Sequence, residues 1–248
     1  MEEYKYDDIW EAYQTFATTA AVLRKGYEQS GMTKTTEDNV PNIADSFRRR
    51  GESDLEHQAK VAWLALVFLR MFWVQGNIDI YPFVVVALCH DVGEIKIGDI
   101  PDDGNPLHDT KDRAERKVFE EVVDQAFIQP SETRRKHELM ELFDNFQNRK
   151  VLGAAIFALD KLEAILMQLL CEKHGNAGDL KEKENCTGRD KRLMEFTGSS
   201  RTSDIWAAHL CLHIKDFPSW IKIPVLGLLD TAVHDVRGVS FSWWRKIL

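Results

Sequence analysis

Four ionisable side chains stand out because they lie in, or at the ends of, segments that are otherwise apolar. His57 heads a run of apolar residues, His90 and Asp91 end a second run, and Asp160 interrupts a third. A buried carboxylate without a compensating charge is strongly unfavourable. One divalent cation would compensate all four groups. Two imidazoles and two carboxylates form a mixed nitrogen and oxygen shell, which suits Mn, Co, Mg, Fe, Ni or Zn and leaves positions open for water and substrate.

The elements that must position these residues follow a helical period. Apolar residues after His57 recur at steps of three and four, as at Val61 and Leu64, which places them on one helix face. The segment 79–91 contains three consecutive valines, which alone would be typical of a strand. We expect a helix there because its neighbours are helical. Further helices are predicted over residues 111–127, 130–146, 150–171 and 205–214, with a loop over 97–109 that is rich in Gly, Pro and Asp.

The predicted fold class is therefore all-α, a helical bundle with additional N- and C-terminal helices. We expect one domain over residues 1–248, with a core of roughly 40–172. Residues 173–204 are polar and contain four glycines, which favours an insert or a lid. Residues 205–248 form a C-terminal extension with an aromatic end.

Composition excludes some classes of partner. The chain has 248 residues, 32 Lys and Arg against 40 Asp and Glu, and a net charge of -8. Because it also lacks a basic tail, it is a poor candidate for binding nucleic acid polymers, whereas a small phosphorylated substrate remains compatible with it. The N-terminus is acidic, the longest apolar stretch is broken by Arg70, and the four cysteines form no C-x-x-C pair. We therefore expect a cytoplasmic protein that does not enter a membrane.

Several motifs resemble those of one known family. The segment His90–Pro101, HDVGEIKIGDIP, is similar to the form H-D-x-x-E-x-x-x-G-D-x-P. The pair Glu56-His57 and the sequence LDKLE at 159–163 occur in the corresponding order and spacing. Together these motifs resemble the HD-domain superfamily of metal-dependent phosphohydrolases, and in particular its HD-type 5'-deoxynucleotidases.

The resemblance implies an all-α HD-domain bundle, one divalent metal ion and removal of phosphate from a nucleoside 5'-monophosphate. His57, His90, Asp91 and Asp160 would hold the metal. Glu94 would be the general acid and base that orients the attacking water, and a metal lowers the pKa of bound water toward about 7. Asp99 would help to hold the sugar of the substrate or the water network. The family also tends to form homodimers.

One departure from the family pattern concerns the phosphate. The 5'-deoxynucleotidases carry an Arg-Trp pair before the first histidine, and the matching positions here are Asn42 and Ile43. The candidate substrate-binding cations are therefore Arg48, Arg50 and Lys96, since guanidinium groups suit phosphate geometry. Cleavage of a phosphate monoester is accordingly better supported than specificity for deoxynucleotides.

Two other functions remain open. Some HD proteins bind two irons with extra histidines and act as oxygenases. Here His108 and His137 do not lie on apolar faces, and His108, His137 and His174 are interpreted as surface histidines. The other alternative is a non-catalytic HD module that binds metal or nucleotide for regulation. The presence of Glu94 argues against it, because a site without turnover has no need of an acid and base.

Overall fold

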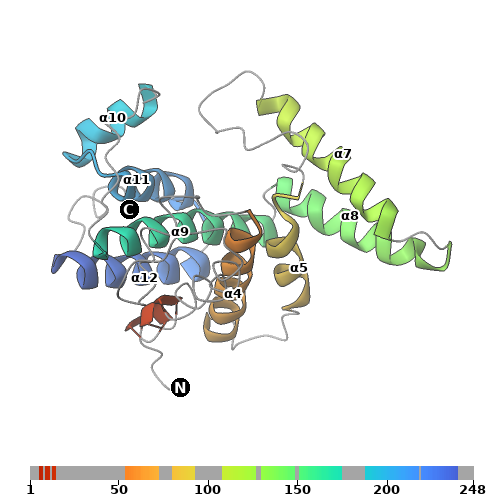
Figure 1. The fold of residues 1–248 in the computed structure, drawn as a ribbon, viewed down its shortest axis with the longest axis horizontal. Helices are drawn as coiled ribbons and strands as arrows, with labels where there is room; N and C mark the ends of the chain where they lie inside the picture. Colours follow the sequence, from red (N-terminus) through yellow and green to blue (C-terminus); the bar gives the residue numbers. More distant parts are fainter. Residues whose placement is uncertain are drawn as a thin grey trace, which may run out of the picture. The chain divides into compact units, whose positions relative to one another are not determined.

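The described part of the chain is predominantly helical. The computed structural model describes residues 6–7, 9–11, 13–14, 54–72, 80–92, 108–126, 130–148, 151–174, 188–217 and 219–239, and no strand occurs among them. The predicted all-α class is thus confirmed (Figure 1). The elements are α4 (Asp54–Phe72), α5 (Tyr81–Cys89), α7 (His108–Ala126), the 3-10 helix η1 (Pro130–Glu132), α8 (Thr133–Gln147), α9 (Val151–Lys173), α10 (Gly188–Thr197), α11 (Thr202–Ile214) and α12 (Ser219–Arg237).

Contacts between residues divide the chain into two compact units. One is residues 61–160, and the other combines residues 1–60 with residues 161–248. The long helices α4 and α9 contribute residues to both units. The domain bounds expected from the sequence stay a prediction.

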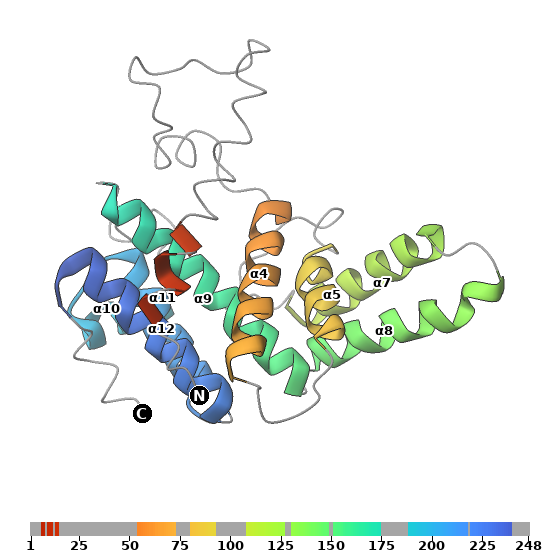
Figure 2. The same ribbon diagram turned by 90° about the horizontal axis from the view of Figure 1, so that it is seen from below.

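In the unit of residues 61–160, α7 and α8 run side by side (Figure 2). Their facing side chains form a cluster of Phe119, Val123, Met140 and Phe143. The rings of Phe119 and Phe143 stack with centroids 4.2 Å apart, a contact that contributes about 0.5–1.5 kcal/mol beyond burial. Cys89, at the end of α5, packs against this cluster and so connects α5 to α8.

The helix α5 confirms the helical interpretation of its three valines. Pro82 lies in its first turn, where the missing backbone N–H is not needed and the fixed φ angle favours a helix. Phe83, Val86 and Ala87 are buried, at the three- and four-residue steps of a helix face rather than the alternation of a strand. Tertiary burial therefore outweighs the weak strand preference of the valines.

In the other unit, Arg237 connects three helices. Its guanidinium donates to both carboxylate oxygens of Glu172 on α9, at 2.9 and 2.7 Å, and to Asp204 on α11. The side chain thereby joins the end of α12 to α9 and α11. The N-terminal residues also pack here, since Trp10 is 2% exposed and donates to Asp235 of α12 at 2.7 Å.

Two helices have no counterpart among the helices that the sequence analysis predicted by residue range. The polar segment 173–204, predicted to be an insert or a lid, contains a helix, because its residues 188–197 form α10. Leu193 is the one buried residue of this helix, and a single buried apolar position in a polar segment gives only a weak periodic signal. The helix α12 contains Pro224, which would normally argue against a helix, yet Pro224 is buried within it.

No helix in the described ranges is long and apolar enough to cross a membrane.

Candidate metal centre

His90 occupies the turn that follows α5 and is 2% exposed. Its Nδ1 lies 2.8 Å from the carbonyl oxygen of Ala87. Because a carbonyl oxygen can only accept, Nδ1 must donate, and a neutral ring then carries its lone pair on Nε2. The backbone of α5 therefore fixes which nitrogen of His90 is available as a metal ligand.

Two carboxylates approach that nitrogen. Nε2 of His90 is 3.1 Å from Oδ2 of Asp91 and 3.9 Å from Oδ1 of Asp160. The Asp91 and Asp160 side chains are 23% and 13% exposed, so water screens them only in part. A lone pair and two carboxylate oxygens are all electron donors, and a cation among them offsets their repulsion. Either a proton on His90 or a metal ion supplies such a charge.

Packing holds the His90 ring in place. The ring of Phe146, at the end of α8, contacts it edge to face, with centroids 5.6 Å apart and planes at 69°. Phe146 can lie there because α8 approaches α9 at Gly153, where a Cβ atom would be 2.5 Å from the carbonyl oxygen of Asn145. The absence of a side chain at Gly153 thus determines how closely the two helices pack.

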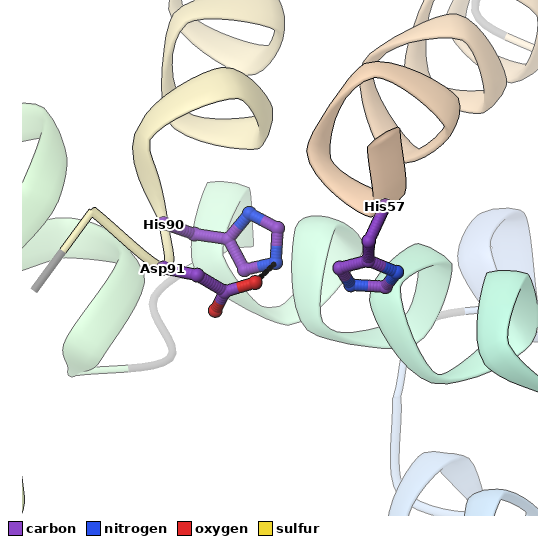
Figure 3. A group of neighbouring side chains, drawn as sticks. All are labelled: His57, His90 and Asp91. Carbon is purple, nitrogen blue, oxygen red and sulfur yellow. Dashed lines mark ion pairs between the residues drawn. The ribbon is translucent and has the colours of Figure 1, made fainter. Parts of the chain in front are cut away.

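His57 lies in the first turn of α4 and is only partly exposed. Taking one ligand atom from each, His57, His90 and Asp91 have donor atoms within 4.8 Å of one another (Figure 3). Two imidazole nitrogens and carboxylate oxygens fit a divalent cation of borderline softness. This group can therefore hold a metal ion.

A model of the HD-domain family, described as "HD domain", matches residues 42–198. The chain belongs to the HD-domain family. The match spans more than half of the chain and includes His57, His90, Asp91 and Asp160. No curated protein and no solved structure matches the chain. The more specific resemblance to 5'-deoxynucleotidases stays a prediction.

The HD domain brings three of the four predicted ligands into one group and places the fourth beside them. Asp160 is not part of the group within 4.8 Å, but its carboxylate adjoins His90. The exposed His137 and His174 agree with their interpretation as surface residues. The side chain of His108, the first residue of α7, lies outside the description, as do Asn42, Ile43, Arg48, Arg50, Glu94, Lys96 and Asp99.

Sequence reasoning missed two buried charged residues next to His57. Glu163, the last residue of LDKLE, is 0% exposed, and Lys60 is 1% exposed. Glu163 lies 2.6 Å from Nδ1 of His57 and 2.8 Å from Nζ of Lys60. Their spacing could have indicated that they lie near the predicted ligands. Glu163 follows Asp160 by three residues and Lys60 follows His57 by three, so each pair shares a helix face.

A third buried acid lies on α7. Glu115 is 9% exposed and pairs with Lys111 at 3.4 Å. Burial raises the pKa of Glu115, Lys111 opposes this shift, and the negative charges of Asp112 and Asp91 add to it. The negative charge of Asp91 thus favours the protonated form of Glu115.

Proposed function

We propose that this HD-domain protein is a metal-dependent phosphohydrolase that cleaves a small phosphate monoester, with a (deoxy)nucleoside 5'-monophosphate as the first substrate class to test. His57, His90, Asp91 and Asp160 would hold one divalent ion. The observation that carries the proposal is the convergence of two partly buried carboxylates on the buried Nε2 of His90, in a chain that belongs to the HD-domain family.

The reaction needs a nucleophile, a base and positive charge near the phosphate. When bound, a divalent cation lowers the pKa of a coordinated water and offsets negative charge on the phosphoryl group. Glu94 would take a proton as the water oxygen bonds to phosphorus. The ester P–O bond then breaks, and the leaving oxygen receives the proton from Glu94, which completes hydrolysis to an alcohol and inorganic phosphate.

Substrate binding would depend on cations that this acidic chain supplies locally. A phosphate dianion is repelled by Asp91 and Asp160, so side chains of opposite charge must accompany it. Arg48, Arg50 and Lys96 are our candidates, with Asp99 contacting the sugar or the water network. Because the family's Arg-Trp pair is Asn42-Ile43 here, we expect base or sugar selectivity to differ from that of the deoxynucleotidases.

A phosphate-release screen tests the function. The full chain would be assayed against ribo- and deoxyribonucleoside 5'-monophosphates with Mn²⁺, Co²⁺ or Mg²⁺. We expect at least one metal and substrate pair to give turnover. Asp91→Ala should lose both metal and turnover, while Glu94→Ala should keep the metal and lower kcat by about 10²–10⁴-fold.

His137→Ala is the matched control, since His137 is an exposed histidine on α8, and this variant should behave like the wild type. Metal binding without phosphate release from any substrate would contradict the proposal and favour a regulatory module. Two irons per chain with consumption of oxygen would instead favour an oxygenase. Unchanged turnover in Glu94→Ala would remove Glu94 from the mechanism.

A further inference from the structure

A buried carboxylate connects His57 to residues outside the candidate metal group. Glu163 is fully buried on α9 and contacts three side chains from distant parts of the sequence. Its Oε2 lies 2.6 Å from Nδ1 of His57. Its Oε1 accepts a hydrogen bond from the hydroxyl of Tyr13 at 2.7 Å and lies 2.8 Å from Nζ of Lys60. We call these four residues the Glu163 cluster.

The cluster determines how the His57 ring is protonated. The buried Glu163 forms an ion pair with Lys60, whose Nζ lies 2.8 Å from Oε1, and Oε1 also accepts a hydrogen bond from Tyr13. Glu163 is therefore an ionised carboxylate, which can only accept hydrogen bonds. Nδ1 of His57 must then donate, and a neutral ring keeps its lone pair on Nε2, the nitrogen that remains for a metal.

We propose that Glu163 is a positioning residue for His57, fixing the tautomer and the orientation of its ring so that Nε2 is directed to the metal. Lys60 and Tyr13 hold Glu163 in place for this role. The inference rests on the metal site of the proposed function. Carboxylates that accept from the second nitrogen of a ligating histidine commonly raise its basicity and restrict its rotation.

Tyr13 gives this arrangement a feature specific to the chain. It is 0% exposed and lies 150 residues from Glu163, before the stretch 42–198 that matches the HD domain. Trp10 anchors the same segment, because its indole N–H donates to Asp235 at 2.7 Å. An N-terminal segment outside the family match thus contributes directly to the surroundings of a predicted metal ligand.

A purely structural ion pair is the competing explanation for Lys60 and Glu163. A buried pair can often be replaced by apolar residues with little loss of stability, whereas removal of one partner leaves an uncompensated charge. Two double variants exploit this difference. One combines Lys60→Met with Glu163→Gln, and the other combines Lys60→Met with Glu163→Leu. Both remove the ion pair, but only glutamine retains an oxygen that accepts from Nδ1 of His57.

The measurement is the Mn²⁺ dissociation constant of the full chain, from competition with a chromophoric chelator. We expect the leucine double variant to bind Mn²⁺ about 10–100-fold more weakly than the wild type. The glutamine double variant should recover most of that loss. The visible spectrum of bound Co²⁺ should change in the leucine variant and resemble the wild type in the glutamine variant. Tyr13→Phe should weaken binding by about 2–10-fold, as expected for one hydrogen bond.

A folded leucine variant that binds Mn²⁺ as tightly as the wild type would overturn the inference, as would equal losses in both double variants. Circular dichroism would establish folding. The wild type supplies a test that needs no folded double variant, namely ¹⁵N chemical shifts of its histidines at pH 8 without metal. His57, assigned with His57→Gln, should be protonated at Nδ1, and protonation at Nε2 would overturn the inference.

These outcomes are separable from those of the proposed function. A wild-type chain that shows the expected affinity pattern but releases no phosphate would contradict the proposed reaction and support the role of Glu163. Phosphate release that persists with unchanged Mn²⁺ affinity in the leucine variant would support the reaction and contradict the role of Glu163.

Discussion

At the scale of single residues, the candidate centre depends on lone pairs that meet where water screens them poorly. Nδ1 of His90 donates to the carbonyl oxygen of Ala87, so the lone pair of a neutral ring lies on Nε2, which faces Asp91 and Asp160. Asp91 is within the 4.8 Å group that can hold a metal, whereas Asp160 adjoins it through His90.

We predict that Asp160→Ala lowers the affinity for Mn²⁺ as severely as Asp91→Ala. Loss of either carboxylate removes a negative donor and leaves His90 with one carboxylate neighbour fewer. Chelator competition would measure both constants. An Asp160→Ala variant with the affinity of the wild type would show that Asp160 is not a ligand, and the predicted set would shrink to His57, His90 and Asp91.

At the scale of elements, the close approach of α8 to α9 positions Phe146 against His90. The approach depends on Gly153, because a Cβ there would lie 2.6 Å from the carbonyl oxygen of Phe146 and 2.7 Å from its Cα. These are backbone atoms, so the clash can be relieved only by moving one helix. Asp160 is seven residues further along α9, about two turns, and thus on the same face as Gly153.

Gly153→Ala should therefore act on both the fold and the centre. We expect a loss of about 1–3 kcal/mol in the free energy of unfolding, the usual cost of overpacking. A weaker Mn²⁺ affinity should accompany it, as α8 shifts Phe146 away from His90. Urea unfolding and chelator competition would measure the two effects.

The matched control is Gly188→Ala in α10, where an added Cβ would meet no atom within 4 Å. Because alanine favours a helix more than glycine does, this variant should be neutral or slightly stabilising and should bind Mn²⁺ normally. Equal stability of the two variants would contradict the role assigned to Gly153.

At the scale of the whole molecule, metal binding should stabilise the fold by mass action. The predicted ligands lie on α4, in the turn after α5 and on α9, and an unfolded chain does not bring them together. A ligand at 100 times its dissociation constant stabilises the folded state by about 2.7 kcal/mol. For a chain of this length, that corresponds to a rise in Tm of roughly 5–10 °C.

Differential scanning fluorimetry with increasing Mn²⁺ would measure this rise. The Tm of Asp91→Ala should not rise with Mn²⁺. The Tm of Glu94→Ala should rise as much as that of the wild type, because Glu94 is assigned to proton transfer rather than to metal binding. A wild-type Tm that does not respond to Mn²⁺, Co²⁺ or Mg²⁺ would contradict a metal site formed by folding.

The sequence alone determined the fold class and the four candidate ligands. Helical periodicity is a local property, and ionisable residues on apolar runs are conspicuous without any structure, as at His90 and Asp160. The apolar periodicity was too weak to predict α10, because this helix is mostly polar and its only buried residue is Leu193.

The tertiary structure decided which long-range partners complete the centre. Glu163 lies 106 residues from His57 and 150 from Tyr13, and no periodicity or spacing connects positions so far apart. A buried lysine or glutamate looks like a surface residue in a sequence, because burial of a charge depends on a partner that only folding supplies. The same reason applies to Gly153, whose importance lies in the backbone of α8 that packs against it.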